Sequence, residues 1–269
     1  MTTCPTFKML GSKARMAKWV LGNVPDRKYE RWIEPFTGRG NVYFRALHDK
    51  SVTFDQALLN DRYMIKFIEA LRDVSDFSFV DPPPIDKALY EKWRGMPKSP
   101  HRWLAESYVC RMGGSFTWGD ETRESWEAQP GDPGPNTTCK HNRHSKKGTE
   151  ARMQAAHDLM SKNPPVTSGV EWETFLRIAN PGPDDIIYCD PPYNTKHKVP
   201  YPNIDHEALL NFLDSTPATV LLSGFNSPLY DAWLQSPKWN KVERERALTA
   251  GAVRGKKKPK KLEVLWIKA

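Results

Sequence analysis

The tetrapeptide Asp190-Pro191-Pro192-Tyr193 follows residues 184–189, a predicted strand whose last four residues are Ile-Ile-Tyr-Cys. Two consecutive prolines stiffen a turn and remove two backbone N–H donors. The Asp190 carboxylate and the Pro191 carbonyl can therefore accept both hydrogens of an exocyclic amine, and the Tyr193 ring offers a face on which a flipped base can stack. Two such acceptors would draw the nitrogen toward tetrahedral geometry and release its lone pair from the aromatic ring. The tetrapeptide predicts a site that activates an aromatic amine, although Asp81-Pro82-Pro83-Pro84 shows that similar turns also arise structurally.

A second candidate site lies where a predicted strand, residues 31–34, turns into a predicted helix. Gly38 and Gly40 let backbone approach a ligand there, and a helix N-terminus favours anionic or polar groups. About twenty residues further on, Asp61 ends the next predicted strand, where an acidic residue accepts hydrogen bonds from ribose hydroxyls. Tyr43 takes the place of the third glycine of the dinucleotide fingerprint, which favours a nucleoside cofactor without a pyrophosphate. A plain turn beside a surface aspartate is the alternative interpretation.

The elements that position these residues follow an α/β pattern in both end regions of the chain. Apolar runs predict strands at 31–34, 52–59, 166–167, 184–189, 218–223 and 262–267. Helical spacing predicts helices at 42–47, 64–71, 172–178 and from Asp205 onward, and we expect Asn41 to cap the first of them. The pattern predicts a single Rossmann-like α/β sheet.

The middle of the chain has a different character. From about residue 76 to residue 164 it is rich in Pro, Trp, His, Lys and Arg and contains few strand signals, and residues 131–136 form a turn-rich break. We therefore predict a catalytic, cofactor-binding domain formed by 1–75 and 165–269, interrupted by a target-recognition region at 76–164.

Several motifs in one order resemble the Dam-type, alpha-group DNA adenine-N6 methyltransferases. The matching segments are 7–13 (Phe-Lys-Met-Leu-Gly-Ser-Lys), 34–40 (Glu-Pro-Phe-Thr-Gly-Arg-Gly), 59–61 (Leu-Asn-Asp), 190–193 (Asp-Pro-Pro-Tyr), 204–206, 221–227 and 263–267. The resemblance covers both ends of the chain and leaves the middle largely unmatched. It implies a Rossmann-like methyltransferase sheet with an inserted DNA-recognition region, and S-adenosylmethionine as the cofactor.

The resemblance also implies roles for single residues. The catalytic residues would be Asp190, Pro191, Pro192 and Tyr193. The cofactor-binding residues would be Met9, Lys13, Glu34, Pro35, Phe36, Gly38, Gly40, Asp61, Glu171 and Asp190. Met9 stands where the family usually has Trp, and methionine can still cover apolar surface. Glu171 stands where relatives often carry an acidic residue near the cofactor's adenine, and an exposed glutamate at a helix start is the alternative.

Basic side chains of the inserted region and of residues 254–261 would neutralise phosphates of double-stranded DNA. The predicted DNA-binding residues are Arg111, Arg123, Lys140, Arg143, Lys146, Lys147, Lys256, Lys257 and Lys258. For any single lysine, a solvated surface is the alternative, and the basic run before the last strand also fits a nuclear-localisation signal.

Composition sets further bounds. The chain has 269 residues and a formal net charge of +8, and no run approaches the ~20 apolar residues of a membrane span. Its first residues lack the apolar core of a signal peptide, and its four cysteines are widely separated, so we expect a cytoplasmic protein with reduced thiols. The spacing of Cys139, His141 and His144 matches no paired-ligand pattern, so we expect no metal.

The sequence therefore predicts an enzyme that methylates the N6 amine of adenine in double-stranded DNA after flipping the base out of the helix. The alternatives are methylation of RNA adenine or of cytosine N4, and a catalytically silent DNA-binding protein of the same fold. We expect a compact orphan enzyme, phage-encoded and working in the host cytoplasm, with no membrane attachment and no obligate protein partner.

Overall fold

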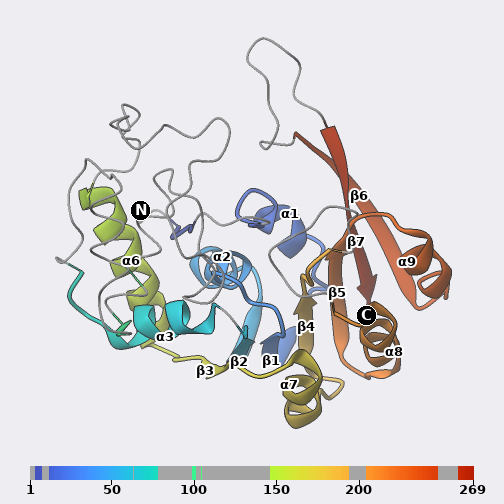
Figure 1. Ribbon diagram of the computed structural model, residues 1–269, viewed down its shortest axis with the longest axis horizontal. Coiled ribbons are helices and arrows are strands. Elements are labelled where there is room, and N and C mark those ends of the chain that lie inside the picture. Colours follow the sequence, from blue (N-terminus) through green and yellow to red (C-terminus); the bar gives the residue numbers. More distant parts are fainter. Residues whose placement is uncertain are drawn as a thin grey trace, which may run out of the picture.

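The structure is a computed structural model that describes residues 4–7, 12–62, 64–77, 99–100, 104, 146–193, 204–247 and 260–269. Its centre is a seven-stranded sheet with the order β3-β2-β1-β4-β5-β7-β6 (Figure 1). The strands are β1 (Lys28–Glu34), β2 (Thr53–Asn60), β3 (Val166–Ser168), β4 (Ile186–Cys189), β5 (Thr219–Gly224), β6 (Trp239–Ala247) and β7 (Lys260–Lys268). Strands β1 to β5 pair in parallel, whereas β7 runs antiparallel to both β5 and β6.

The strand order reverses between β1 and β4, and this reversal is the switch point at which doubly wound sheets bind ligands. The predicted Rossmann-like α/β fold is confirmed.

Helices cover both faces of the sheet (Figure 1). They are α1 (Ala17–Leu21), α2 (Asn41–Asp49), α3 (Ile65–Asp73), α6 (Lys146–Ser161), α7 (Trp172–Ala179), α8 (His206–Ser215) and α9 (Pro228–Trp233). Buried residues of α1, α2, α3 and α6 share one core, and those of α7, α8 and α9 share the other. Among the helices of the described ranges, none has the length and apolar character needed to span a membrane.

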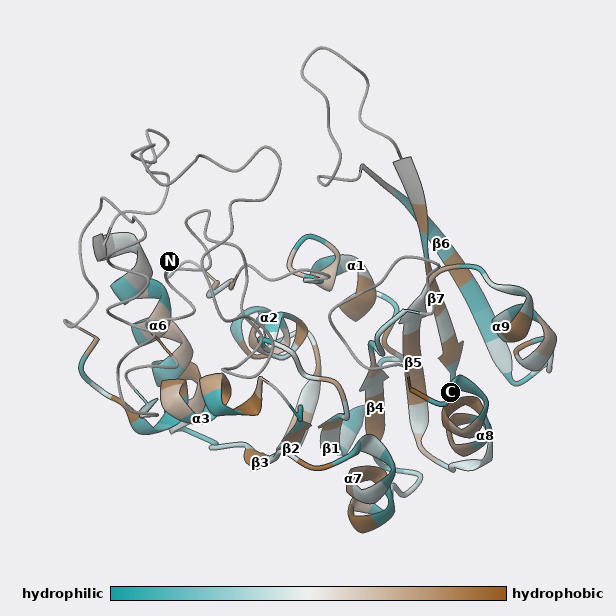
Figure 2. Ribbon diagram, in the orientation of Figure 1, coloured by the Kyte–Doolittle hydropathy of each residue, from teal (hydrophilic) through white to brown (hydrophobic). Residues whose placement is uncertain are grey.

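The central strands β4 and β5 are largely apolar because both of their faces are covered. All residues of β4 and β5 are buried. Ile186 and Tyr188 pack into the core of α1, α2, α3 and α6, whereas Ile187 and Cys189 pack into the core of α7, α8 and α9. The edge strand β6 is instead largely hydrophilic (Figure 2), and charged residues on an edge discourage pairing with another chain.

The predicted strands and helices of the two end regions are confirmed within three residues at their boundaries. Asp205 caps α8, because its Oδ1 accepts a hydrogen bond from Ala208 N at 2.9 Å. The predicted cap of α2 is wrong. Gly40, with φ of 66°, is the residue that precedes this helix, and Asn41 already lies inside it.

The Asn41 side chain instead binds the N-terminal segment. Its Oδ1 accepts from Phe7 N at 2.8 Å and its Nδ2 donates to Phe7 O at 2.9 Å. Asn41 thereby fixes residues 4–7 against α2, and the Phe7 ring packs on Phe44 and Phe67.

Four elements were not predicted, namely α1, α6, α9 and β6. Of these, α6 lies inside the predicted recognition region and nevertheless packs on the main core. Met153, Ala156 and Met160 follow one another at helical spacing and are each at most 1% exposed.

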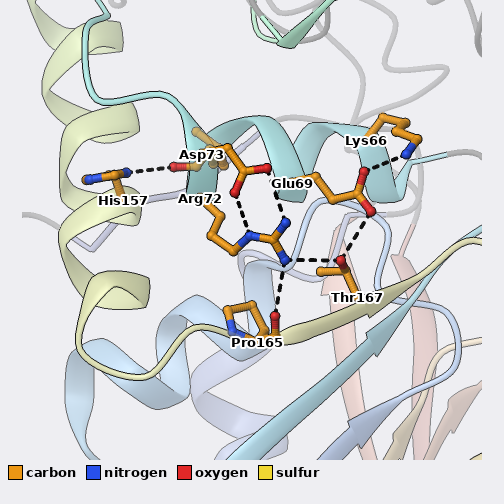
Figure 3. A network of polar contacts seen from close by, with 8 residues as sticks. Lys66, Glu69, Arg72, Asp73, His157, Pro165 and Thr167 are labelled. Atoms are coloured by element: carbon orange, nitrogen blue, oxygen red, sulfur yellow. Dashed lines mark hydrogen bonds and ion pairs between the residues drawn. The ribbon is translucent and has the colours of Figure 1, made fainter.

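Polar contacts hold the same helix and the chain after it against α3 (Figure 3). His157 Nδ1 lies 3.1 Å from Leu71 O, and Arg72 Nη1 donates to Pro165 O at 3.3 Å and to Thr167 Oγ1 at 3.2 Å. We therefore propose that residues 146–164 belong to the catalytic domain and that the recognition region ends before α6.

Met160→Ala tests this packing. Removing a fully buried methionine leaves a cavity, so we expect the free energy of unfolding to fall by about 2–5 kcal/mol. Urea unfolding followed by circular dichroism measures the change, and Lys162→Ala, at an exposed position just after α6, should change it by less than ~0.5 kcal/mol. A Met160→Ala protein as stable as the wild type would contradict the assignment of α6 to the core.

Candidate active site

The loops after β1, β2 and β3 meet at the carboxyl edge of the sheet and are tied to one another by Asn60. The Asn60 Nδ2 donates to Pro35 O at 3.0 Å and to Val170 O at 3.1 Å, while its Oδ1 accepts from Val170 N at 3.2 Å. The side chain is 1% exposed, so these bonds satisfy a buried amide. Asn60 thereby holds these three loops together at the carboxyl edge of the sheet.

The glycine turn after β1 is held by Asp61. Gly38 and Gly40 have φ values of 55° and 66°, which suit glycine rather than residues with a side chain. Asp61 Oδ2 accepts from Gly38 N at 2.8 Å, and its Oδ1 accepts from Met64 N at 2.8 Å at the start of α3. A carboxylate has about four acceptor positions, so two backbone bonds are compatible with a ribose hydroxyl as a further donor.

The predicted catalytic aspartate lies at the end of β4 beside a buried lysine. Lys13 Nζ is 2.6 Å from Asp190 Oδ1 and 3.0 Å from Glu263 Oε1. Lys13 also donates to the Tyr193 hydroxyl, and its ammonium lies 4.6 Å from the centre of the Tyr193 ring. The structure thus brings Lys13 together with Asp190 and Tyr193, which lie 177 and 180 residues after it in the sequence.

Burial and charge act against each other on Asp190. Burial raises the pKa of this carboxyl, the Lys13 ammonium lowers it, and the Glu263 carboxylate raises it again. The Asp190 side chain is 19% exposed, whereas Lys13 and Glu263 are almost completely enclosed. One ammonium faces two carboxylates, so the cluster carries excess negative charge when all three groups are ionised.

The rest of the tetrapeptide borders this cluster. Pro191 is buried and Pro192 is half-buried. The Tyr193 ring packs edge-on against Phe225, with ring centres 4.4 Å apart, and Phe225 follows β5 directly. The Tyr193 ring, in contact with Phe225, therefore lies beside the partly exposed Asp190.

His206 lies behind the tetrapeptide and is buried. Its Nδ1 is 2.8 Å from the Tyr230 hydroxyl, and its ring also hydrogen-bonds to the backbone of Pro192. Burial lowers the pKa of His206, which favours the neutral ring at neutral pH. Its neighbour Asp205 caps α8. The hydrogen bond to Pro192 indicates that His206 supports the tetrapeptide.

Glu34, Pro35 and Phe36 lie beneath and beside the glycine turn. Pro35 is buried, and the half-buried Phe36 ring lies 6.5 Å from the Trp172 ring of α7. Glu34 is 1% exposed and accepts from Trp32 Nε1 at 2.9 Å. Burial, with a contribution from the negative charge of Asp190, raises the pKa of Glu34 to about 8. Glu34 is therefore a buried support of the turn and carries a proton at neutral pH.

Other predicted site residues lie apart from this cluster. Glu171 precedes α7, is 55% exposed, and forms an ion pair with Arg62. Lys146 and Lys147 begin α6. The predicted residues Met9, Arg111, Arg123, Lys140, Arg143, Lys256, Lys257 and Lys258 lie outside the described residues. Within the described ranges, no group of three or more His, Cys, Asp or Glu side chains is placed to hold a metal ion.

Glu263 is the member of the cluster that the sequence analysis did not select as a site residue. A usable signal existed, because Glu263 is the one charged position within the strand segment Leu262–Ile267, where every other residue is apolar. A buried charge in such a strand requires a partner, and a partner points to a site.

Glu34→Gln tests the burial of Glu34. The native state retains a proton up to about pH 8 that the unfolded chain releases near its ordinary pKa of 4.5. The stabilising effect of that proton is therefore complete below pH 4.5 and is lost as the pH rises to about 8, at up to ~1.4 kcal/mol per pH unit.

We expect the variant to gain stability relative to the wild type as the pH rises from 5 to 8, in urea unfolding at each pH. Glu30→Gln, at an exposed position of the same strand, should follow the wild type. A constant difference between Glu34→Gln and the wild type across this range would contradict the raised pKa.

Comparison with known proteins bears on this arrangement. The model of the family of D12 class N6 adenine-specific DNA methyltransferases matches residues 10–77, which include Lys13, the glycine turn and Asp61. No curated protein sequence matches the chain. Among solved structures, the rRNA methyltransferase aviRa from Streptomyces viridochromogenes matches with a TM-score of 0.41 and 14% identity, over 99% of this chain and 88% of that one.

The resemblance that the sequence motifs predict is confirmed: this chain is similar, over residues 10–77, to the D12 class of N6 adenine-specific DNA methyltransferases.

Proposed function

We propose that this protein is a methyltransferase, which transfers the methyl group of S-adenosylmethionine to the N6 amine of adenine in double-stranded DNA after the base has been flipped out of the helix. The observation that carries the proposal is the partly exposed Asp190 carboxylate at the end of β4, held beside Tyr193 and next to the switch point of the sheet. This is the place and the chemistry expected of an acceptor for an exocyclic amine.

The described residues fit S-adenosylmethionine at the carboxyl edge of the sheet. Asp61 lies at the end of β2 beside the glycine turn, where it suits ribose hydroxyls. The partly exposed Asp190 carboxylate suits the positive sulfonium group. When bound, S-adenosylmethionine supplies the methyl carbon that the amine nitrogen attacks, while the sulfur leaves with the bonding electron pair.

The chain's own residues would position the amine for this attack. The Asp190 carboxylate accepts one amine hydrogen and the Pro191 carbonyl accepts the other, which directs the nitrogen lone pair away from the aromatic ring. The Tyr193 and Phe225 rings offer stacking surfaces for the flipped base. Stacking on them would offset the few kcal/mol that it costs to unstack the base from the DNA. Methylation makes the nitrogen acidic, and its proton can leave to water. Catalysis then rests on orientation and hydrogen bonding.

Basic segments would bind the DNA backbone. The strands β6 and β7 form a two-stranded antiparallel ribbon that pairs as far as Ala247 and Lys260. The sequence run 254–261 contains six Lys and Arg residues. Phosphate contacts there, and in the recognition region before α6, would give DNA binding that weakens steeply with salt.

Asp190→Ala tests the proposal in cells that lack adenine methylation of their own. DNA is isolated from cells expressing either protein, digested, and its nucleosides quantified by mass spectrometry. We expect N6-methyladenine with the wild type and at least a ~100-fold decrease with the variant, because the amine loses its acceptor. Asp184→Ala, an exposed aspartate at the opposite end of β4, should retain the wild-type level.

Other outcomes would change the proposal in defined ways. N4-methylcytosine in the DNA would retain the amine chemistry and replace the target base. Modified adenine in RNA alone would replace the nucleic acid. Full activity of Asp190→Ala would remove Asp190 from the reaction.

A further inference from the structure

Glu263 occupies an unusual position for a carboxylate. It lies on β7 opposite Arg244 of β6, next to Val264, which pairs with Gly224 at the end of β5. Its side chain is completely buried in a strand whose neighbouring residues are apolar. Leu265 and Ile267 belong to the core beneath α1 and α2, and alternation places Glu263 on that same face of the sheet.

On that face Glu263 meets two residues of the candidate active site. Its Oε1 accepts from the Tyr193 hydroxyl at 2.6 Å and from Lys13 Nζ at 3.0 Å. Enclosing an ionised carboxylate is costly unless it is paired, and these contacts supply both a counter-charge and a hydrogen-bond donor.

The Tyr193 hydroxyl has one hydrogen to donate and two carboxylates within reach. The oxygen of Glu263 is 2.6 Å away, whereas that of Asp190 is 3.2 Å away. The shorter contact takes the hydrogen, and Lys13 donates to the phenolic oxygen. Glu263 therefore directs the Tyr193 hydrogen away from the acceptor that the target amine requires.

The Lys13 ammonium is divided between the same two carboxylates, at 2.6 Å from Asp190 and 3.0 Å from Glu263. An incoming amine has to share the Asp190 carboxylate with Lys13, which contacts its Oδ1. Glu263 offers Lys13 a second anionic partner within reach, so the ammonium need not return to water when Asp190 turns to the amine.

We propose that Glu263 is a positioning residue of the methyl-transfer site: it holds the Lys13 ammonium and the Tyr193 hydroxyl so that Asp190 can accept the target amine. This inference rests on the proposed function. Glu263 acts through its two neighbours and does not itself contact the amine.

The role of Glu263 has a signature in the pH dependence of the rate. The titratable groups around Asp190 are Lys13, Tyr193, Glu263 of β7, Glu34 of β1, Tyr188 and Cys189 of β4, and Tyr230 of α9. The negative charge of Glu263 raises the pKa of Asp190. Removing that charge lowers this pKa, so the acidic limb of the kcat profile should move to lower pH.

Glu263→Gln tests the inference, because the amide keeps the size of the side chain and removes its charge. Methyl transfer from radiolabelled S-adenosylmethionine to unmethylated DNA gives kcat and KM, and calorimetry gives the Kd for S-adenosylmethionine. We expect kcat to fall at least ~30-fold, Kd and the KM for DNA to stay within about 3-fold, and the acidic limb to shift to lower pH. The control is Glu243→Gln, because Glu243 is an exposed residue of β6 that forms an ion pair with Lys241. This variant should retain wild-type kcat.

Tyr193→Phe provides a second variant that does not remove the buried charge. If Glu263 acts through Tyr193, the combined effect of Glu263→Gln and Tyr193→Phe on kcat should be smaller than the product of the single effects. A multiplicative combination would contradict this route.

The failure of the inference is distinct from failure of the proposed function. A wild-type protein that methylates no DNA would refute the proposed function. An active wild type with an equally active Glu263→Gln variant would overturn the positioning role alone. A variant that loses kcat and cofactor affinity in parallel, with an unmoved pH profile, would also overturn it, because Glu263 would then be a cofactor-binding or purely structural residue.

Discussion

The burial of one lysine between two carboxylates is the interaction on which the site depends. Lys13 precedes α1, Asp190 ends β4 and Glu263 lies on β7, so a single ammonium joins the N-terminal segment, the centre of the sheet and its antiparallel strand. None of these charges could be enclosed alone without a large desolvation cost, whereas together they satisfy one another. The fold therefore has to bring three segments that are distant in the sequence to one point.

Two features of the fold meet this requirement. Asn41 binds both backbone groups of Phe7 and also donates to Ser12 Oγ at 3.1 Å, which fixes the segment that carries Lys13. The antiparallel strand β7 pairs with β5 up to Gly224, and Glu263 follows immediately beyond that pairing. A Cβ on Gly224 would lie 2.9 Å from the Trp266 ring, so glycine is required where the two strands and Trp266 come together. The parallel strand β4 leads to Asp190, and β7 carries the second carboxylate, Glu263.

Much of this structure could be predicted from local sequence, and the remainder depends on distant contacts. The strands around Ile187 and Leu221 are continuous apolar runs, and Asp190 directly follows one of them, so both the sheet and the position of this aspartate at its edge were predictable. The role of Asn41 was not, because its partner Phe7 is 34 residues away and helix capping is the commoner use of an asparagine at that point. Glu263 was matched as part of a motif, but its function depends on Tyr193, 70 residues earlier. Helix α6 was missed because its buried residues are spaced among the charged residues of a basic region.

The central claim is most directly tested by the stability of Lys13→Met, alone and combined with Glu263→Gln, in urea unfolding at pH 8. Removing the ammonium leaves two carboxylates enclosed without a counter-charge, so the single variant should lose about 3–5 kcal/mol. Adding Glu263→Gln removes one of those charges, so the double variant should regain at least ~1 kcal/mol relative to Lys13→Met. A Lys13→Met protein within ~0.5 kcal/mol of the wild type, or effects of the two substitutions that simply add, would contradict the claim that this ion cluster holds the site together.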